Sequence, residues 1–322
     1  MVKKGKQRSV GDERRNLYAE VTDRIIAELE AGRLPWVQPW GNGNSELELP
    51  KNAATRRAYA GINILVLWGA VIEGGYPSQL WLTFRQALTL GGSVRKGERG
   101  TTVFYADRFI PKEATERALE TGEEPGAVAF LKRFTVFNVA QIDGLPEDAA
   151  TSSAPLPERE IIFEAEALIA ATEADFRIGG DRAFYAPSAD FIQVPPQPAF
   201  FEQINYYRTA FHELGHWTGH SSRLNRDLAG TRGSDLYARE ELVAELSSAF
   251  LCASLRIVPI VRHADYLGSW LQVLREDNRA IFRAASQASK AADFILNFRG
   301  NRPGICTAQA PSQPAWVAGG AS

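Results

Sequence analysis

The sequence has few of the features that would mark a secreted or membrane protein. Among its 322 residues it has only two cysteines, Cys252 and Cys306. Cys252 lies in a helical apolar pattern, so we expect reduced thiols rather than a disulfide framework. No apolar run reaches the roughly 18 residues that span a bilayer. The basic start leads into an amphipathic pattern, not into the apolar core of a signal peptide. These absences predict a cytoplasmic protein that does not enter a membrane.

Net charge is also small, but it is unevenly distributed along the chain. The formal net charge is −2, yet residues 1–142 carry 20 Lys and Arg against 16 Asp and Glu, whereas the remainder carries 16 against 22. Four of the seven tryptophans also fall in residues 1–142. If the protein binds nucleic acid, the first half is therefore the half that we expect to bind it.

The chain is longer than one hydrophobic core usually supports, so we expect two domains. A Pro-, Ala-, Ser- and acid-rich stretch that begins at Asp143 has little that could fill a core and is typical of a linker. In the first half we expect helices over 17–29, 57–70 and 81–90 and long strands over 94–109 and 127–142. In the second half we expect a hairpin over 183–194 and helices over 161–174, around the histidines, over 236–255 and over 264–298. The expected division is a basic tail at 1–11, a first domain at 12–142, a linker at 143–158, a second domain at 159–300 and a tail at 301–322.

Three of the four histidines lie in the stretch FHELGHWTGH, which spans residues 211–220. His212 and His216 are four residues apart on a predicted helix, so both imidazoles project from one face and can bind one metal ion. Glu213 follows directly and is placed to accept a proton from a metal-activated water. This is the HExxH arrangement of zinc hydrolases.

A catalytic zinc needs a third protein ligand. His220 follows Gly219, which we expect to stop the helix, and Ser222 stands where a longer HExxHxxGxxH motif would need its third histidine. The acidic stretch REELVAEL is the better donor. We expect Glu241 to be the ligand, with Glu240, Glu245 and His220 as second-shell or alternative ligands. Imidazole with carboxylate suits Zn²⁺, and Mn²⁺ or Co²⁺ could replace it in vitro.

HExxH also occurs by chance in core helices, where each histidine meets a local hydrogen bond. Three observations favour a metal here: histidine is scarce elsewhere, an acidic helix follows downstream, and the upstream strand DFIQV, residues 190–194, is placed to be a substrate-aligning edge. A closed structural zinc with His220 as fourth ligand is the remaining alternative.

The first half mixes aromatic residues with cations, as single-stranded nucleic-acid sites do: bases stack on rings while cations follow the phosphates. Trp68, Phe134 and Phe137 fit core positions better, and a charge run is often only a solvated face. The candidate DNA-binding residues are Trp36, Trp40, Arg56, Arg57, Tyr59, Asn63, Trp81, Arg85, Arg95, Lys96 and Arg99.

Several runs resemble the ArdC antirestriction proteins in the order that this family shows. The runs IIAELEAGRLPWVQPW, YAGINILVLW, WLTFRQALTLGGSVRKGERGTTVFY and FTVFNVAQID resemble its N-terminal single-stranded-DNA-binding domain. FHELGHWTGHSSRLNR and YAREELVAELSSAFL resemble the metallopeptidase domain that follows. The resemblance covers about residues 12–298.

The resemblance implies an α+β protein with an α+β DNA-binding domain and a mainly helical, zincin-like metallopeptidase domain. It implies a conjugative-plasmid or mobile-element protein in a bacterial host that binds single-stranded DNA non-specifically and protects incoming DNA from restriction. His212, His216 and a Glu of YAREELVAEL would be the metal ligands and Glu213 the catalytic base. Two alternatives remain: a protease acting on a restriction-enzyme subunit or other host protein, with DNA binding only for localisation, and a DNA-binding protein with a structural metal.

Overall fold

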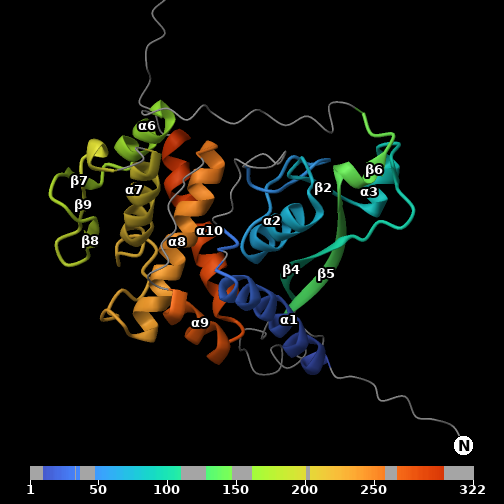
Figure 1. Ribbon diagram of the computed structural model, residues 1–322, viewed down its shortest axis with the longest axis horizontal. Helices are drawn as coiled ribbons and strands as arrows, with labels where there is room; N and C mark the ends of the chain where they lie inside the picture. Colours follow the sequence, from blue (N-terminus) through green and yellow to red (C-terminus); the bar gives the residue numbers. More distant parts are fainter. Residues whose placement is uncertain are drawn as a thin grey trace, which may run out of the picture.

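The computed structural model describes residues 10–32, 34–36, 48–109, 128–146, 162–200, 204–257 and 267–300. Long helices occupy the middle of the molecule, with a four-stranded sheet on one side and a small three-stranded sheet on the other (Figure 1). Within the described residues, no helix is both long and apolar enough to cross a bilayer.

The first half is a mixed helix and sheet unit. Its sheet has the strand order β1-β2-β5-β4, in which β5 pairs antiparallel with both neighbours and β1 is parallel to β2. The apolar helix α2 packs against the outer strand β4. The elements are α1 (Val10–Glu30), β1 (Lys51–Asn52), α2 (Ile62–Gly74), β2 (Leu80–Thr83), α3 (Phe84–Thr89), β3 (Ser93–Val94), β4 (Thr101–Phe109), β5 (Val128–Asn138) and β6 (Ile142–Asp143).

The helix predicted from residue 81 begins three residues later than expected. Trp81 and Leu82 are fully buried in β2, so this part of the apolar run is a core strand. The hydroxyl of Thr83 then accepts the backbone N–H of Gln86, and the Gln86 side chain accepts the N–H of Thr83. This capping box fixes the start of α3 at Phe84.

The second half is mainly helical, as expected. Its small sheet has the order β7-β9-β8, with β9 parallel to β7 and antiparallel to β8. Helix α8 is buried at every position from Glu241 to Ala253, which explains why apolar residues occur on all its faces. The elements are α6 (Phe163–Ala171), β7 (Asp175–Ile178), β8 (Phe184–Ala186), β9 (Phe191–Val194), α7 (Ile204–Trp217), α8 (Asp235–Leu255), α9 (Leu267–Glu276) and α10 (Ala280–Leu296).

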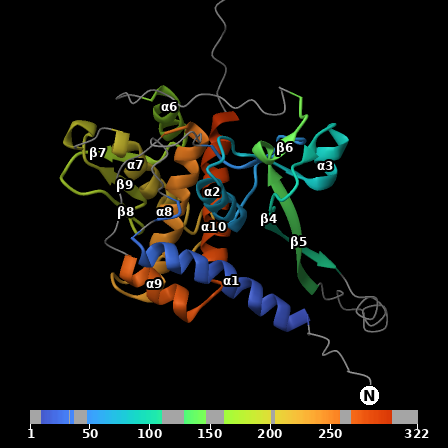
Figure 2. The same ribbon diagram turned by 45° about the vertical axis from the view of Figure 1, so that its right-hand side comes forward.

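The two halves share one hydrophobic core. Helix α1 lies along α9, and α10 packs against α2 as well as α8 (Figures 1 and 2). The rings of Trp36 and Trp270 meet edge to face at 5.7 Å, and the backbone N–H of Gly61 donates to the hydroxyl of Ser289 at 2.8 Å. The predicted domain boundaries stay predictions, since the tails and most of the linker lie outside the described residues. Either half expressed alone would expose this shared core.

Candidate functional site

The two helices that carry the HExxH motif and the acidic stretch approach each other at a glycine. An alanine Cβ at Gly215 would lie 3.1 Å from the Cα of Ala244 on α8 and 3.3 Å from the Cβ of Ser247. Such contacts are tighter than most that a Cβ makes, so with any other residue here α8 would have to move away by a few tenths of an ångström. The short distance brings the carboxylates of α8 within reach of the histidines of α7.

The structure brings together His212, His216 and Glu241. Nε2 of His212 lies 3.2 Å from Nε2 of His216. Oε2 of Glu241 lies 3.4 Å from Nε2 of His212, and Oε1 lies 3.5 Å from Nε2 of His216. In the described part of the chain these three residues form the group of potential metal ligands, with donor atoms within 4.8 Å of one another.

These distances fit a tetrahedral metal ion. Donors about 2.0 to 2.2 Å from such an ion lie roughly 3.3 to 3.5 Å from each other. The two imidazole nitrogens, 3.2 Å apart, are close to this range, and each oxygen of Glu241 lies within 3.5 Å of one of them. Two imidazole nitrogens and one carboxylate, with a further position left for solvent, are the donor set of a catalytic zinc-type site.

Each histidine is backed by a glutamate, which is itself held by an arginine. Nδ1 of His216 lies 3.2 Å from Oε1 of Glu240. Arg226 donates to both oxygens of Glu240, at 2.7 and 3.0 Å, and its Nη2 also donates to the carbonyl of Gly215. A proton on Nδ1 of His216 leaves Nε2 as the electron-pair donor, so this contact selects the tautomer that a metal needs.

The second such chain lies deeper in the protein. Nδ1 of His212 lies 3.5 Å from Oε2 of Glu245, whose other oxygen pairs with Arg208. Arg208 and Glu245 are each 1% exposed. Burial lowers the pKa of Arg208 to about 10, which leaves the guanidinium charged at neutral pH. Glu240 and Glu245 therefore lie behind the histidines, not among the three converging donors.

The two carboxylates nearest His216 control its protonation. Burial by itself lowers the pKa of His216, but Glu240 and Glu241 outweigh it and raise this pKa to about 10. Burial raises the pKa of Glu241, but both imidazoles outweigh it and hold that pKa well below its ordinary value. Glu241 is therefore an anion at neutral pH, which is the form that binds a cation.

Glu213 lies beside the three donors and is 7% exposed. Burial is the main reason that its pKa is raised, and the negative charge of Glu241 adds to the effect. The two histidines and a backbone hydrogen bond with Tyr185 of β8 act in the opposite direction. A carboxylate with a raised pKa is a better proton acceptor near neutral pH.

A cleft of about 460 Å³ opens over these residues. One wall is the segment of β8 with its flanks, the floor is α7, and the other wall comes from the loop before α8 and its first turns. The sequence interpretation placed the substrate-aligning edge at 190–194, but β9 is the central strand of its sheet. The strand next to the cleft is β8, which forms the edge.

His220 does not join the donor group. Its Nδ1 lies 2.8 Å from the hydroxyl of Ser222, and it follows the turn by which Gly219 leaves α7. At Gly219 an added Cβ would meet Leu228, Arg226 and the carbonyl of His216 at 2.8 to 3.0 Å. The expectation that His220 could be an alternative ligand finds no support in this geometry.

The prediction that two of the tryptophans, Trp36 and Trp81, contact DNA is wrong. Trp36 is 3% exposed and Trp81 is 0% exposed, so neither ring is open to a base. The carboxamide of Asn63 is already hydrogen-bonded within the protein. It donates to the carbonyl of Phe104 on β4 at 2.7 Å and accepts the N–H of the same residue at 2.8 Å. Tyr59 is half-buried. Trp40 lies outside the described residues.

The predicted cations are exposed, and a hydrogen bond links the two segments that carry three of them. Asn52 joins its carboxamide to Gln86 in the first turn of α3 at 3.0 Å. This ties the loop that carries Arg56 and Arg57 to the helix that carries Arg85. We call Arg56, Arg57, Phe84 and Arg85 the α3 surface.

Phe84 is one of three exposed aromatic residues of the first half that the sequence reasoning missed, and a second, Phe134, was wrongly expected in the core. Phe84 is 53% exposed and meets Phe137 edge to face at 6.4 Å. Tyr105 and Phe134 are also exposed, at 55% and 45%. Phenylalanine in an apolar pattern predicts a core position, and only the capping box that begins α3 at Phe84 could have suggested that this ring faces outward.

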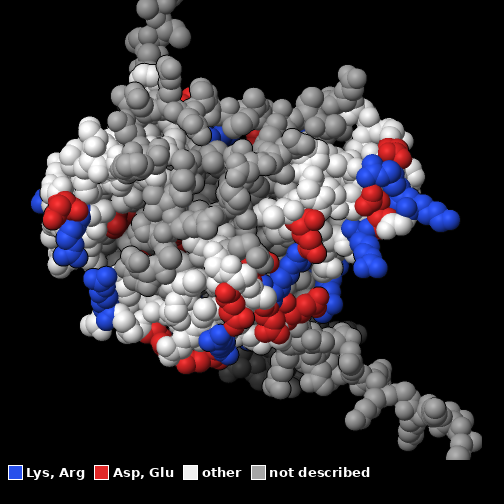
Figure 3. All heavy atoms as spheres, viewed as in Figure 1, with Lys and Arg blue, Asp and Glu red and all other residues white. Residues whose placement is uncertain are grey.

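Other predicted cations differ in their partners. Arg95 pairs with Glu98 at 2.7 Å and lies 3.6 Å from Asp143. Within the described part of the chain no ion pair is formed by Lys96 or Arg99. Lys and Arg side chains project from the end of the molecule where α3 and β6 lie, with some acidic neighbours (Figure 3).

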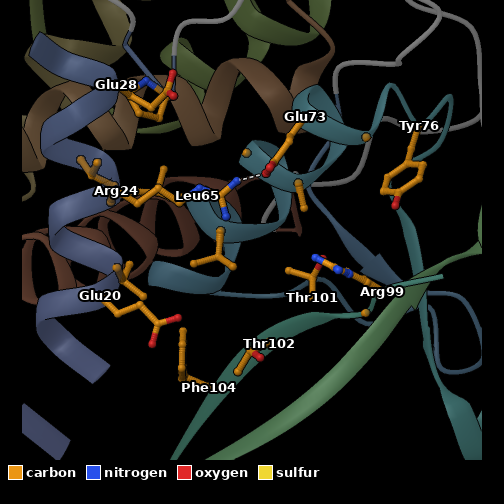
Figure 4. A pocket seen from close by; sticks show the side chains of 18 residues that line it. Glu20, Arg24, Glu28, Leu65, Glu73, Tyr76, Arg99, Thr101, Thr102 and Phe104 are labelled. Atoms are coloured by element: carbon orange, nitrogen blue, oxygen red, sulfur yellow. Dashed lines mark hydrogen bonds and ion pairs between the residues drawn. The ribbon is translucent and has the colours of Figure 1, made fainter. Parts of the chain in front are cut away.

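The first half also has a groove, but the groove is too acidic to favour DNA. This groove, of about 420 Å³, lies between α1, α2 and the start of β4. Glu20 and Glu28 on α1 and Glu73 on α2 line it, together with Arg99 and with Arg24, which crosses it to pair with Glu73 (Figure 4). Three carboxylates against two guanidinium groups leave the groove with a net negative charge, which disfavours a phosphate backbone. The α3 surface is therefore the better candidate for nucleic acid.

Two family profiles match this chain. One, described as the N-terminal domain of anti-restriction factor ArdC, matches residues 15–137, and one described as zincin-like metallopeptidase matches residues 163–287. The fold and the site thus define a zincin-like metallopeptidase domain preceded by an ArdC N-terminal domain. This confirms the two-domain, mixed helix and sheet fold class expected from the sequence.

Similarity to complete proteins identifies the family. Crystal structures of the antirestriction ArdC protein from the R388 plasmid cover 88% of this chain and 98% of theirs. The metal-free form is 42% identical with a TM-score of 0.74, and the Mn(II)-bound form is 41% identical with a TM-score of 0.73. The chain belongs to the ArdC family, as its motifs indicated.

Two further relatives differ greatly in length. The uncharacterized protein y4eC of Sinorhizobium fredii is 42% identical over 284 residues, which is 87% of this chain and 91% of y4eC. A DNA primase TraC of Escherichia coli is 41% identical over 317 residues, which is 92% of this chain but only 29% of TraC. The similarity to TraC therefore says nothing of the rest of that protein.

Proposed function

We propose that this chain is an antirestriction protein of a plasmid or other mobile element. In this proposal it binds single-stranded DNA through the α3 surface and hydrolyses peptide bonds at a divalent-metal centre. The family membership and the plasmid origin of the similar ArdC protein support the antirestriction role. The convergence of His212, His216 and Glu241 beside Glu213 is the observation that carries the enzymatic part.

The proposed ligands are Nε2 of His212, Nε2 of His216 and the carboxylate of Glu241. Their donor set suits Zn²⁺, and the fact that the similar R388 protein has a Mn(II)-bound structure supports a divalent ion. A divalent ion bound there would supply Lewis-acid chemistry, because it polarises a peptide carbonyl and makes a water molecule more acidic.

Glu213 is the proposed general base. Its carboxylate accepts the proton of the attacking water, and the acid so formed returns that proton to the leaving amine. The backbone contact with Tyr185 and the surrounding burial hold this carboxylate at the cleft floor. Arg226, acting through Glu240, keeps the imidazole of His216 oriented, and Glu245, paired with Arg208, lies behind His212.

The edge strand β8 provides the proposed alignment of the peptide. In an antiparallel strand one residue's N–H and C=O point to the same side. Tyr185 lines the cleft and its backbone contacts Glu213, so that side faces the cleft and the Tyr185 carbonyl is the group open to a peptide N–H. An extended peptide can pair with this edge as an added strand. Pro187, which has no N–H, would end the pairing.

An open site favours catalysis over the structural-metal alternative. A structural zinc usually has four protein ligands. Here three donors converge among the described residues, His220 bonds to Ser222 instead, and the cleft gives access to the remaining side. The geometry therefore supports a reactive centre.

The α3 surface is the proposed site for single-stranded DNA. Phe84 offers an exposed ring for stacking on a base, and Arg57 and Arg85 provide cations for phosphates. Such binding depends little on sequence and weakens as salt rises. Full-length protein should therefore bind a fluorescent oligonucleotide with a clear salt dependence, measured by anisotropy.

Transfer of unmodified DNA into restricting and non-restricting recipients tests which activity protects. Four proteins are compared: wild type, Glu213→Gln, the double variant Phe84→Ala/Arg85→Gln, and the two combined. We expect each activity to contribute, so that every variant protects less than wild type. Full protection by Glu213→Gln would show that proteolysis is not part of the mechanism. Full protection by Phe84→Ala/Arg85→Gln would show that DNA binding through the α3 surface is not part of the mechanism.

A further inference from the structure

The metallopeptidase cleft holds two cations that the proposed chemistry does not use. Arg182 lines the wall formed by the β8 segment, and Arg232 lines the opposite wall in the loop before α8. Both are exposed, and neither forms an ion pair with another described residue. Other arginines of this region are paired: Arg223 with Asp190, and Arg226 with Glu240.

The other charges of the cleft are already balanced. A divalent ion would offset Glu213 and Glu241, and Arg226 offsets Glu240. The charges of Arg182 and Arg232 therefore remain as the net charge that an incoming ligand meets. A cleft lined by unpaired charge of one sign favours ligands of the opposite sign and disfavours those of the same sign.

We propose that the cleft selects extended peptides with acidic side chains close to the bond that faces the metal centre, and that Arg182 and Arg232 make this selection. The inference rests on the proposed peptidase function, because it names the substrate class of the same site. A peptide is favoured over single-stranded DNA because β8 offers a strand edge with which a peptide backbone can pair and a nucleic-acid backbone cannot.

Binding and cleavage are measured separately, with full-length protein loaded with Zn²⁺ or Mn²⁺. The probes are two labelled peptides of equal length and identical apolar centre, one flanked by Glu and Asp and the other by Lys and Arg. Their affinities are measured by anisotropy on the Glu213→Gln background, where the peptide stays intact. Cleavage of quenched versions is measured with wild-type protein. The selectivity variants are Arg182→Gln, Arg232→Gln and the double change.

The control variant is Arg177→Gln. Arg177 lies on β7 of the same sheet, outside the cleft lining, and forms an exposed pair with Asp175. The Arg177→Gln variant loses the same charge as each cleft variant, but we expect its peptide selectivity to be unchanged because Arg177 does not line the cleft. Each cleft substitution should reduce the preference for the acidic peptide about threefold to fivefold, as expected for an exposed charge pair. The preference should also shrink at high salt.

The outcomes separate this inference from the function on which it rests. The selectivity inference is supported if the preference for the acidic peptide falls in the Arg182 and Arg232 variants but not in Arg177→Gln. Equal binding of both peptides, or a preference that the cleft variants leave unchanged, overturns it even if peptides are cleaved. Binding of a single-stranded oligonucleotide, but not of the acidic peptide, through these arginines also overturns it. Selective binding without any Glu213-dependent cleavage supports the selectivity and contradicts the peptidase function.

Discussion

Nε2 of His212 and Nε2 of His216 lie 3.2 Å apart. Because Nδ1 of His216 faces Glu240, the neutral ring has its proton there and presents a lone pair on Nε2. Both oxygens of Glu241 face these two nitrogens. Once His216 has lost its Nε2 proton, three electron-pair donors point at one region, and a cation between them offsets their repulsion.

Loss of one donor should therefore weaken metal binding strongly. We expect His212→Ala or Glu241→Ala to reduce the affinity for Zn²⁺ or Mn²⁺ by at least about 100-fold, because loss of even an outer-shell partner costs 10- to 100-fold. Glu213→Gln should keep the affinity within a few-fold. Titration against a chromophoric chelator measures this. Wild-type affinity in Glu241→Ala would show that another group is the third ligand.

Metal binding should also depend on pH in a defined direction. The pKa of His216 is raised to about 10, so below that pH its proton must leave before Nε2 can bind an ion. Affinity should rise roughly tenfold per pH unit as pH increases toward this pKa, and then level off. Competition titrations from pH 6 to 9 give the slope, and calorimetry in two buffers counts the released protons. A flat profile would contradict the assignment of His216 as ligand.

The buried pair behind His212 gives a stability prediction. Arg208 and Glu245 are each 1% exposed, so Glu245→Gln leaves a guanidinium charge in the core without its partner. We expect the free energy of unfolding to fall by about 3 to 5 kcal/mol. Arg208→Met combined with Glu245→Gln should restore part of this loss, since no charge is then buried. Urea unfolding of metal-free protein measures both. An equally large loss in the double variant would mean that the pair itself, not the stranded charge, provides the stability.

The sequence predicted the metal centre well because its chemistry is local. HExxH spacing on a helix fixes the relative positions of His212, Glu213 and His216, and the helical face of REELVAEL limited the third donor to a few carboxylates. The tertiary contact that distinguishes Glu241 from Glu240 and Glu245 is set by the approach of α8 at Gly215. No local pattern contains that distance.

The nucleic-acid surface was harder to predict, because burial is a property of the whole fold. Trp81 and Phe84 stand three residues apart in the same apolar run, yet one is fully buried and the other is 53% exposed. The change from strand to helix at Thr83 separates them. The shared core of the two halves has the same origin: contacts such as Trp36 with Trp270 join residues far apart in the sequence.

The close approach of α7 and α8 can be tested directly. In Gly215→Ala the new Cβ would lie 3.1 Å from the Cα of Ala244, so one helix must shift. Overpacking of this kind costs about 1 to 3 kcal/mol. Because Glu241 lies on the displaced helix, metal affinity should fall as well, even though no donor is changed. Gly69→Ala, at a helical glycine where an added Cβ meets no atom within 4 Å, is the control. Unchanged metal affinity in Gly215→Ala would show that the site tolerates the shift.

The two neighbouring aromatic residues of the first half should differ in what they control. Trp81→Ala empties a fully buried position, so we expect the free energy of unfolding to fall by about 3 to 5 kcal/mol. Phe84→Ala removes a half-exposed ring that touches Phe137 only at its edge, and its cost in stability should be about 1 kcal/mol or less. If Phe84 stacks on a base, its loss should weaken single-stranded DNA binding at least about fivefold. Unfolding curves and anisotropy titrations of the same samples separate the two effects. Wild-type DNA affinity in Phe84→Ala would move the stacking site away from α3, with Tyr105 and Phe134 as the next exposed rings to substitute.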